Sequence, residues 1–472
     1  MSTTALDLYD NAPLNRRFWF VFCSISLVLV FEFFDFYIVG FLLAVLGPQW
    51  HLTYGQSSII LLSAGLGSIF GAFVWGKRAD VWGRKVMIAI GTMICAAGSG
   101  FFAIVPDGAW LTFASLRFVV GFGLGASVTP CITMAVELTP TRHRSFIPGL
   151  IVGFSVVGTL VASGTAAFLL SVLGWRGVSV LGLAPLVPGL MVWLLVPESV
   201  RWLISRGRTS EARAVVARQL NIPLELVPPA VAGSTVAAQP KPTLRELYSS
   251  DPARFWFTLV AGLCLSTAGY GVNLWGPTII AMVLKISVKE VGHIFIYVAC
   301  SGIIGKLIFS FLPHYIGRRP CGQIYGYGIF ITLGLAGWFH ASFLGSVSMF
   351  VVFLCIGAIF FDGGHSTTSP YAAEIFPVRL AAGGVGLLQG ANGVGKILGP
   401  VSLALLAGTN NLITPKATSE AVVPGFLFLA GCGLCVGVAF TLYRKETRGR
   451  ALALRDEVKQ IPKSDGVRVS SR

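Results

Sequence analysis

The sequence predicts an all-α membrane protein with twelve transmembrane helices in two pseudo-symmetric six-helix lobes. Its composition is the first reason, because 54% of the 472 residues are hydrophobic and 12% are charged, whereas soluble domains carry about 25% charged residues. Apolar runs long enough to span a bilayer also recur along the chain. In addition, two motifs occur once in each half. Each spanning run must be helical, because lipid offers no partner for backbone N–H and C=O groups.

The first apolar run covers residues 18–47 and is interrupted only by Glu32 and Asp35. It is too long for a signal-peptide core, and no small-residue cleavage site follows it, so we expect it to remain in the mature chain. The same pattern gives the predicted spans 18–46, 57–76, 86–106, 110–135, 146–171, 178–197, 255–284, 291–313, 322–341, 346–372, 381–407 and 424–443.

The longest polar stretch separates the first six spans from the last six. It begins with the helix-like segment SEARAVVARQL and continues through VPPAVAGSTVAAQPKP, which is typical of a flexible linker. We therefore expect a cytoplasmic N-terminus (1–17), an N-terminal lobe (18–197), a cytoplasmic linker (198–254), a C-terminal lobe (255–443) and a cytoplasmic tail (444–472).

The net charge of +15 reflects topology rather than binding of nucleic acid. With the N-terminus inside, the cations on the outer side are Arg176, Lys285, Lys289 and Lys416, and those within spans are Arg117, Lys306 and Lys396. Every other Lys and Arg falls on the cytoplasmic side, as the positive-inside rule requires. This predicts cytoplasmic termini in a plasma membrane, typically a bacterial inner membrane. The nine cysteines lie in spans or at cytoplasmic edges, so no disulfides are expected.

Two motifs are repeated between the halves. ELTPTR (137–142) and EIFPVR (374–379) share E-x-x-P-x-R, and GKRADVWGRK (76–85) corresponds to SFLPHYIGRR (310–319). An even number of spans separates the two copies of each motif, so the copies run parallel, as in two-lobed secondary transporters. The chain is therefore expected to contain an internal duplication.

These motifs resemble those of the major facilitator superfamily. G-x-x-x-D-x-x-G-R-K after the second span is similar to its cytoplasmic gate motif, and RFVVGFGLG (117–125) resembles its second signature. PESVRWL (197–203) and ETRGR (446–450) are similar to sugar porter signatures. The aspartate in FFDFYIVG (33–40) is shared in type with sugar porters, aromatic acid/proton symporters, and relatives of synaptic vesicle glycoprotein 2 and of nicotinate transporters. GAFVWGKRADVWGRK (71–85) is most similar to the last two groups. The resemblance implies the major facilitator fold, with the first and fourth helices lining a central cavity.

Charges near the helix ends are candidates for a cytoplasmic gate, since ion pairs there can latch one conformation. The alternative is that they only set topology. Glu137 with Arg142, and Glu374 with Arg379, either extend this network or cap their own helices. His314 stands where the first copy has Asp80, which predicts a weaker second latch. The gate candidates are Gly76, Asp80, Gly83, Arg84, Lys85, Glu137, Arg142, Glu374 and Arg379.

Asp35, Arg117 and Glu32 are the candidates for proton coupling, because ionisable residues within a membrane are functional by default. At about 1.5 Å per residue, Asp35 lies roughly 25 Å and Arg117 roughly 30 Å from the cytoplasmic edge. A buried carboxylate near an arginine can switch between paired and protonated states. The resemblance supports this role, and a static structural pair is the alternative. Glu32, three residues before Asp35, either shares the proton site or pairs elsewhere.

A second group of polar residues suits a small, partly planar anion, because it combines aromatic rings, amides and a cation. Gln389, Asn392 and Lys396 lie on one helical stripe, and Arg117 is a further candidate for the substrate carboxylate. The alternative for the whole group is hydrogen bonding between helices. The substrate candidates are Arg117, Tyr270, Asn273, Trp275, Asp362, His365, Gln389, Asn392 and Lys396.

Residues 390–396 match G-x-x-x-x-G-K, the start of a phosphate-binding loop. Ile397 replaces the Ser or Thr that holds magnesium, and the stretch lies inside a predicted span rather than between a strand and a helix. The six histidines are scattered, so no metal site is expected. The chain is therefore not expected to be an enzyme, and Lys396 becomes a candidate contact for an anionic substrate or for Asp362.

The sequence thus predicts a secondary active transporter for proton-coupled uptake of a small organic acid anion, benzoate-like or nicotinate-like, by alternating access. It needs no cofactor beyond the proton and is expected to act as a monomer in the bilayer. The alternative is a sugar or polyol carrier, against which the seventh span, STAGYGVNLWGP, lacks glutamines. The fifth span lacks the G-P pair of drug exporters, which favours uptake. A non-transporting membrane receptor or an ATP-hydrolysing membrane enzyme is the alternative from a different functional class.

Overall fold

The computed structural model describes residues 4–143, 147–154, 156–230 and 242–448. Within those ranges, ten helices are long and apolar enough to cross a membrane. The two remaining predicted spans are also helical: 146–171 corresponds to two shorter helices, and 322–341 to one that is less apolar. The prediction of an all-α membrane protein is confirmed by these helices.

The N-terminal lobe begins with a short helix that packs on its outside. The chain reverses direction at Gly174, whose φ of +65° lies in the region that favours glycine. The elements are α1 (Ala5–Asp10), α2 (Arg16–Gln49), α3 (Tyr54–Trp82), α4 (Arg84–Gly100), η1 (Phe101–Ile104), α5 (Trp110–Leu138), η2 (Thr141–His143), α6 (Ile147–Phe154), α7 (Val157–Phe168), α8 (Leu170–Leu181) and α9 (Leu186–Leu195).

The helix-like segment predicted at 210–220 is confirmed as α11, whereas most of VPPAVAGSTVAAQPKP lies outside the described residues. The connecting and C-terminal helices are α10 (Val200–Ser205), α11 (Thr209–Leu220), η3 (Leu224–Leu226), α12 (Leu244–Ser250), α13 (Pro252–Leu284), α14 (Val288–Ile316), α15 (Arg318–Trp338), α16 (Met349–Ile375), α17 (Val378–Ala407) and α18 (Pro415–Leu442).

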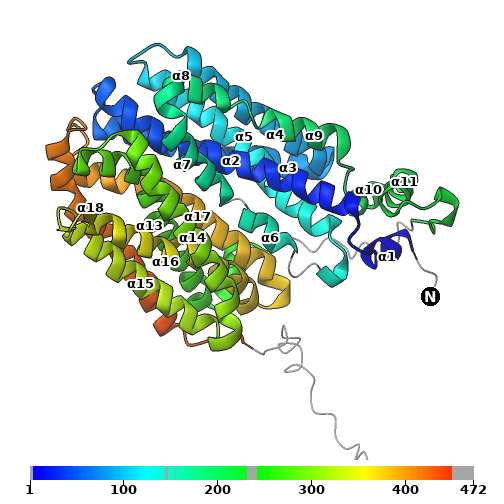
Figure 1. Cartoon of the computed structure of the whole chain (residues 1–472). Coiled ribbons are helices and arrows are strands. Elements are labelled where there is room, and N and C mark those ends of the chain that lie inside the picture. The colour runs from blue at the N-terminus through cyan, green and yellow to red at the C-terminus, as the bar shows by residue number, and fades with distance from the viewer. Residues whose placement is uncertain (1–3, 144–146, 155, 231–241, 449–472) are drawn as a thin grey trace, which may run out of the picture.

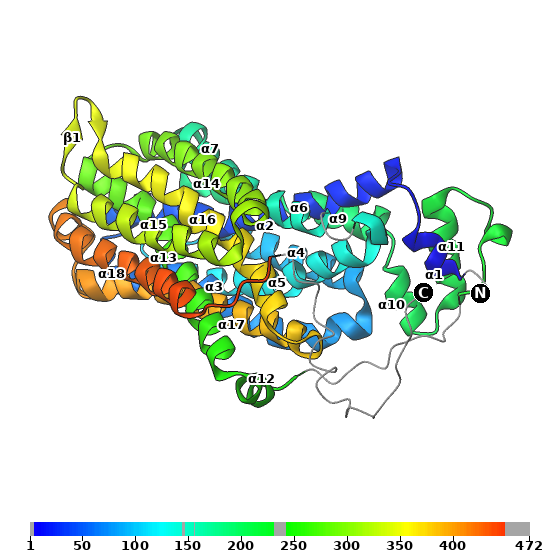
Figure 2. The ribbon, with the colours of Figure 1, turned by 90° about the horizontal axis from the view of Figure 1, so that it is seen from below.

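The span predicted to begin at residue 346 begins later, because β1 (Phe343–Leu344) and β2 (Val347–Ser348) pair as an antiparallel hairpin before α16. The turn of this hairpin carries Gly345 at a φ of +63°. The hairpin and α1 lie at opposite ends of the molecule (Figure 2). We call the end with α1, α10 and α11 the terminal end, and the other the opposite end.

The two lobes lie side by side, α2 to α9 in one and α13 to α18 in the other (Figure 1). They contact each other through α7 with α14, α3 with α17, and α2 with α13. On α2, a Cβ at Gly40 would lie 2.7 Å from the carbonyl oxygen of Leu274 on α13, so a small residue permits this approach. Nearer the terminal end, a Cβ at Gly76, Gly386 or Gly390 would meet open space.

At the opposite end, backbone hydrogen bonds join the lobes. The N–H of Tyr54 donates to the carbonyl of Asn411 at 2.9 Å, and the N–H of Ile413 donates to the carbonyl of Leu52 at 3.1 Å. These bonds flank Thr53 and Leu412, which form an antiparallel bridge. We call residues 52–55 and 409–413 the interlobe bridge.

The interlobe bridge predicts a specific cross-link. Thr53 and Leu412 occupy a non-hydrogen-bonded antiparallel position, where Cα atoms lie about 4.5 Å apart, within the range that a disulfide spans. Oxidising the Thr53→Cys/Leu412→Cys double variant should therefore hold the lobes together and stop most uptake into liposomes, and a reductant should restore it. The single Thr53→Cys variant, oxidised in the same way, is the control. Undiminished uptake by the fully cross-linked protein would show that the bridge need not open.

Candidate functional site

Arg117 on α5 holds the backbone of α2. Its side chain is buried, and its Nη1 donates to the carbonyl of Asp35 at 2.9 Å while Nη2 donates to the carbonyl of Phe36 at 3.3 Å. Its guanidinium also lies 6.0 Å from the ring centroid of Phe102. The structure therefore brings Arg117 to Asp35 as the sequence suggests, but through main-chain carbonyls.

The Asp35 carboxylate points to α4. It accepts hydrogen bonds from the Ser99 hydroxyl at 2.5 Å and from the Cys95 thiol at 3.4 Å. Among the ion pairs of the described residues, none joins it to Arg117. Asp35 and Arg117 are each 1% exposed, so they lie inside the N-terminal lobe. In this conformation both side chains are packed among α2, α4 and α5.

Glu32 lies one turn before Asp35 and is fully buried. Neither of its carboxylate oxygens has a hydrogen-bond partner within the described part of the chain. The Ser127 and Cys131 side chains of α5 lie near it, and so does the Asp35 carboxylate. Burying an unpaired charge is costly. The Glu32 side chain must therefore be protonated, or it must gain a hydrogen-bond partner when the helices rearrange.

Lys396 on α17 reaches the boundary between the lobes. Its Nζ lies 5.2 Å from the ring centroid of Tyr270 on α13 and 5.7 Å from that of Phe36 on α2. Such cation–π contacts hold an ammonium group in an apolar setting without neutralising it. Lys396 makes no ion pair among the residues that the structure describes, so the contact with Asp362 considered from the sequence is not formed.

Two aromatic rings contact this lysine, those of Phe36 and Tyr270, and Tyr37 packs against both rings; we call Phe36, Tyr37 and Tyr270 the aromatic cluster. Tyr270 lies edge-on to Phe36, with centroids 5.5 Å apart at 77°. It is nearly parallel to Tyr37, with centroids 6.0 Å apart at 13°. Tyr270 is among the substrate candidates from the sequence, whereas Phe36 and Tyr37 are not. Their only signal is that they directly follow the intramembrane Asp35.

A second charged group lies in the C-terminal lobe. The Asp362 carboxylate packs on Gly302 of α14, where a Cβ would lie 2.4 Å from its Oδ2. Lys306, one turn further along α14, is the charged neighbour of Asp362. The charges of Lys306 and Lys396 both act on His365. Lys306 therefore has the Asp362 carboxylate as a neighbour, whereas Lys396 has no carboxylate partner among the ion pairs of the described residues.

The other substrate candidates divide between packing and hydrogen bonding. Asn392 donates to Gln389 at 3.0 Å and accepts from the Ser266 hydroxyl of α13 at 2.9 Å, which favours the interhelical alternative for these amides. Asn273 is buried on α13. Trp275 is also buried, and its indole N–H donates to the carbonyl of Pro400 at 3.1 Å.

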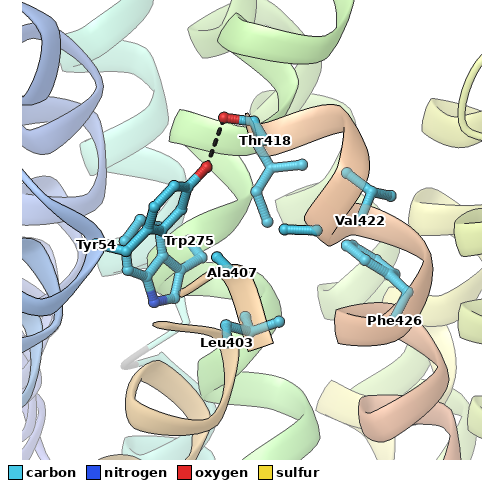
Figure 3. A pocket seen from close by; sticks show the side chains of 9 residues that line it. Tyr54, Trp275, Leu403, Ala407, Thr418, Val422 and Phe426 are labelled. Atoms are coloured by element: carbon cyan, nitrogen blue, oxygen red, sulfur yellow. Dashed lines mark hydrogen bonds between the residues drawn. The ribbon is translucent and has the colours of Figure 1, made fainter. Parts of the chain in front are cut away.

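Trp275 lines an apolar cavity, and Lys396 is not among the residues that line it (Figure 3). Its ring lies beside that of Tyr54, with centroids 5.4 Å apart. The Tyr54 hydroxyl of the N-terminal lobe is hydrogen-bonded to the Thr418 hydroxyl of the C-terminal lobe at 2.6 Å. The cavity is otherwise lined by hydrophobic residues of α13, α17 and α18. A carboxylate would find no cation there, so Trp275 belongs to the packing between the lobes.

The first gate motif is a network within the N-terminal lobe. Arg84 lies 3.4 Å from both Asp80 and Glu137. The Glu198 carboxylate of PESVRWL accepts from the N–H groups of Arg84 and Lys85, each at 3.2 Å, and so caps α4. Gly83, at a φ of +100°, makes the turn that presents those N–H groups.

The second copy repeats this arrangement with different partners. Gly317 has a φ of +94°, and Glu446 of ETRGR accepts from the N–H groups of Arg318 and Arg319, each at 3.0 Å. Burial opposes the charge on Glu446, but backbone N–H groups hold its pKa below the usual value. Arg318 forms a bidentate pair with Glu374, with an Nη2–Oε1 distance of 2.5 Å. The second copy therefore keeps its ion pair despite His314.

Neither E-x-x-P-x-R motif pairs its own glutamate and arginine. Glu137 pairs with Arg84, and Glu374 with Arg318, because the loops after α3 and α14 lie against these helix ends. Arg142 is exposed in η2. Arg379 is exposed and acts on Glu246 of α12. Glu137 and Glu374 therefore extend the gate network, one of the two roles that the sequence left open, but their partners are not the arginines of their own motifs.

Comparison with known proteins decides the family. The model of the Major Facilitator Superfamily matches residues 25–400. The chain belongs to this superfamily. It is thus an integral membrane transporter and not an enzyme.

Among curated relatives, the niacin transporter NiaP of Acinetobacter baylyi is 24% identical to this transporter over 453 residues, 94% of this chain and 97% of that protein. The 4-hydroxybenzoate transporter PcaK of the same species is 25% identical, over 87% of this chain and 89% of that protein. The gallate transporter of Pseudomonas putida is 27% identical, over 83% and 86%.

Solved structures support the fold of the transporter. The xylose transporter XylE of E. coli, in an inward open conformation, superposes with a TM-score of 0.68 at 16% identity, covering 92% of this chain and 97% of that one. A D-xylose–proton symporter gives a TM-score of 0.72, also at 16% identity, over 92% and 99%. At this identity the likeness shows the fold alone.

Proposed function

We propose that this transporter takes up a small aromatic or heteroaromatic carboxylate, benzoate-like or nicotinate-like, together with a proton. The observation that carries the proposal is Lys396, whose ammonium lies over Tyr270 and Phe36 without a carboxylate partner in the described structure. An aromatic anion complements both features, because its carboxylate pairs with the cation and its ring packs on the aromatic side chains.

Asp35 is the proposed proton carrier. Its carboxylate is buried with neutral partners, Ser99 and Cys95, so gaining a proton removes a charge from an apolar setting. Arg117 holds the carbonyls of Asp35 and Phe36, which connects the protonated residue to the aromatic cluster along one turn of α2. Glu32, one turn away on α2, is the proposed partner for proton exchange through a rearrangement of α2 and α5. The proton is the only coupling species that this scheme requires.

The relatives support the same substrate class. Niacin, 4-hydroxybenzoate and gallate each carry a carboxylate on an aromatic ring, and the corresponding transporters match most of this chain. Sugar or polyol transport is the second candidate, suggested by PESVRWL and ETRGR. In the structure, Glu198 and Glu446 of these motifs cap α4 and α15, so helix capping accounts for both without a sugar.

The proposed setting is a plasma membrane, such as a bacterial inner membrane, with the terminal end in the cytoplasm and the transporter acting as a monomer. The proposed boundaries remain 18–197 and 255–443 for the lobes, with 198–254 between them. The arginines of α10 and α11 at the terminal end support this orientation through the positive-inside rule.

Uptake into liposomes tests the proposal. With an imposed inward proton gradient and no ATP, labelled benzoate and nicotinate should accumulate inside liposomes that contain the purified protein, and xylose should not. Collapsing the gradient with a proton ionophore should reduce internal substrate to the equilibrium level, because the gradient supplies the driving force. Accumulation of xylose alone would favour the sugar carrier. Accumulation that requires ATP would contradict secondary transport.

A further inference from the structure

We infer that Tyr270 is the aromatic specificity determinant, and that the substrate ring replaces Tyr37 on its face when the transporter loads. This inference rests on the proposed function and adds a mechanism for choosing aromatic acids over saturated ones. It concerns the two tyrosines that stack across the lobe boundary, with centroids 6.0 Å apart and an interplanar angle of 13°.

The tyrosine pair lies at the boundary where the two lobes must separate. Tyr37 belongs to α2 and Tyr270 to α13. About one turn beyond each tyrosine, towards the opposite end, Gly40 packs against the carbonyl of Leu274. Nearer the terminal end, α17 exposes Gln389 and Gly390. The stack therefore lies on the lobe boundary, between the close approach at Gly40 and the exposed residues of α17.

Alternating access requires these helices to separate on the opposite side during the cycle. Separation removes the ring of Tyr37 from Tyr270 and leaves an aromatic face without a partner. An aromatic substrate can cover that face, whereas a saturated ring of similar size has no π system to offer it. Stacked aromatic pairs account for up to roughly a tenfold difference in affinity beyond the area they bury.

The position of Lys396 aligns the substrate with this face. Its Nζ lies over the Tyr270 ring, 5.2 Å from the centroid, so the cation is adjacent to the ring that recognises the substrate. Phe36 closes the edge of the same ring, with centroids 5.5 Å apart. An acid whose carboxylate is attached directly to an aromatic ring fits this arrangement. The geometry favours such acids over those with a long chain between the two groups.

Competition experiments with matched acids test the inference. Benzoate and cyclohexanecarboxylate have the same charge and similar size, so the ratio of their inhibition constants measures recognition of the aromatic ring. In the wild type, benzoate should bind several-fold more tightly. Tyr270→Leu should reduce that preference to near unity, whereas Tyr270→Phe should retain it. If Tyr270→Leu does not fold, as judged by gel filtration in detergent, Tyr270→Ile replaces it.

A Tyr37 variant distinguishes replacement of the Tyr37 ring by the substrate from simple packing between the helices. Because Tyr37 competes with the substrate for Tyr270, Tyr37→Leu should keep the preference for benzoate and bind it at least as tightly as the wild type. A preference that survives in Tyr270→Leu, or that Tyr37→Leu loses to the same extent, would overturn the inference. A wild type that transports neither acid would instead overturn the proposed function, so the two failures are distinguishable.

Discussion

Replacing Asp35 with asparagine is expected to abolish accumulation of substrate while leaving exchange measurable. Asparagine keeps the size of the side chain and can still bond to Ser99 and Cys95, but it cannot take up and release a proton. The lobes should still alternate around the substrate, so counterflow of labelled against unlabelled acid should continue. Uptake driven by a proton gradient should fall to the equilibrium level. Both quantities are measured in the same liposomes.

Asp107→Asn is the matched control for this experiment. Asp107 forms an ion pair with Arg176 at 3.0 Å, and both side chains are about half exposed, so its loss should change little. Accumulation against a gradient by Asp35→Asn would exclude Asp35 as the essential proton carrier. Glu32→Gln would then be the next variant, because Glu32 is the neighbouring buried carboxylate.

Replacing Lys396 with glutamine is expected to weaken substrate binding about 10- to 100-fold, because charge-assisted hydrogen bonds contribute about 1.5–3 kcal/mol. The neutral side chain can still lie beside Tyr270 and Phe36, so the aromatic packing should persist. The apparent affinity for benzoate, measured by competition, reports the loss directly. The maximal rate of exchange should change less than the affinity, since the lobes themselves are unaltered.

Two further lysine variants make the result specific. Lys396→Arg keeps the charge and should recover part of the affinity, although the guanidinium differs in shape from an ammonium. Lys416→Gln changes an exposed lysine near the start of α18 and should leave affinity unchanged. An unaltered affinity in Lys396→Gln would show that the substrate carboxylate binds elsewhere, with Lys306 as the next cation to replace.

The helices were predictable because membrane insertion acts on local composition. A run such as residues 18–47 must be helical wherever it lies, and the repeated motifs show that the halves correspond. The hairpin at residues 343–348 was not predictable in this way, since strands of two residues carry little signal in a sequence. The ion pairs at the terminal end were not predictable from local sequence either. Glu137 and Arg142 are near in sequence, but Glu137 pairs with Arg84 across two helices.

The sequence by itself determined the class of protein, the spans, and the charged residues that a membrane does not tolerate without a role, among them Asp35, Arg117 and Lys396. Only the tertiary structure decided their partners. It placed Arg117 on main-chain carbonyls and Lys396 between two aromatic rings. The physical reason is that nearly every position of a membrane helix is apolar. In the sequence, an aromatic residue such as Tyr37 therefore cannot be distinguished from the apolar residues around it. Only the packing of the helices shows which side chains its ring contacts.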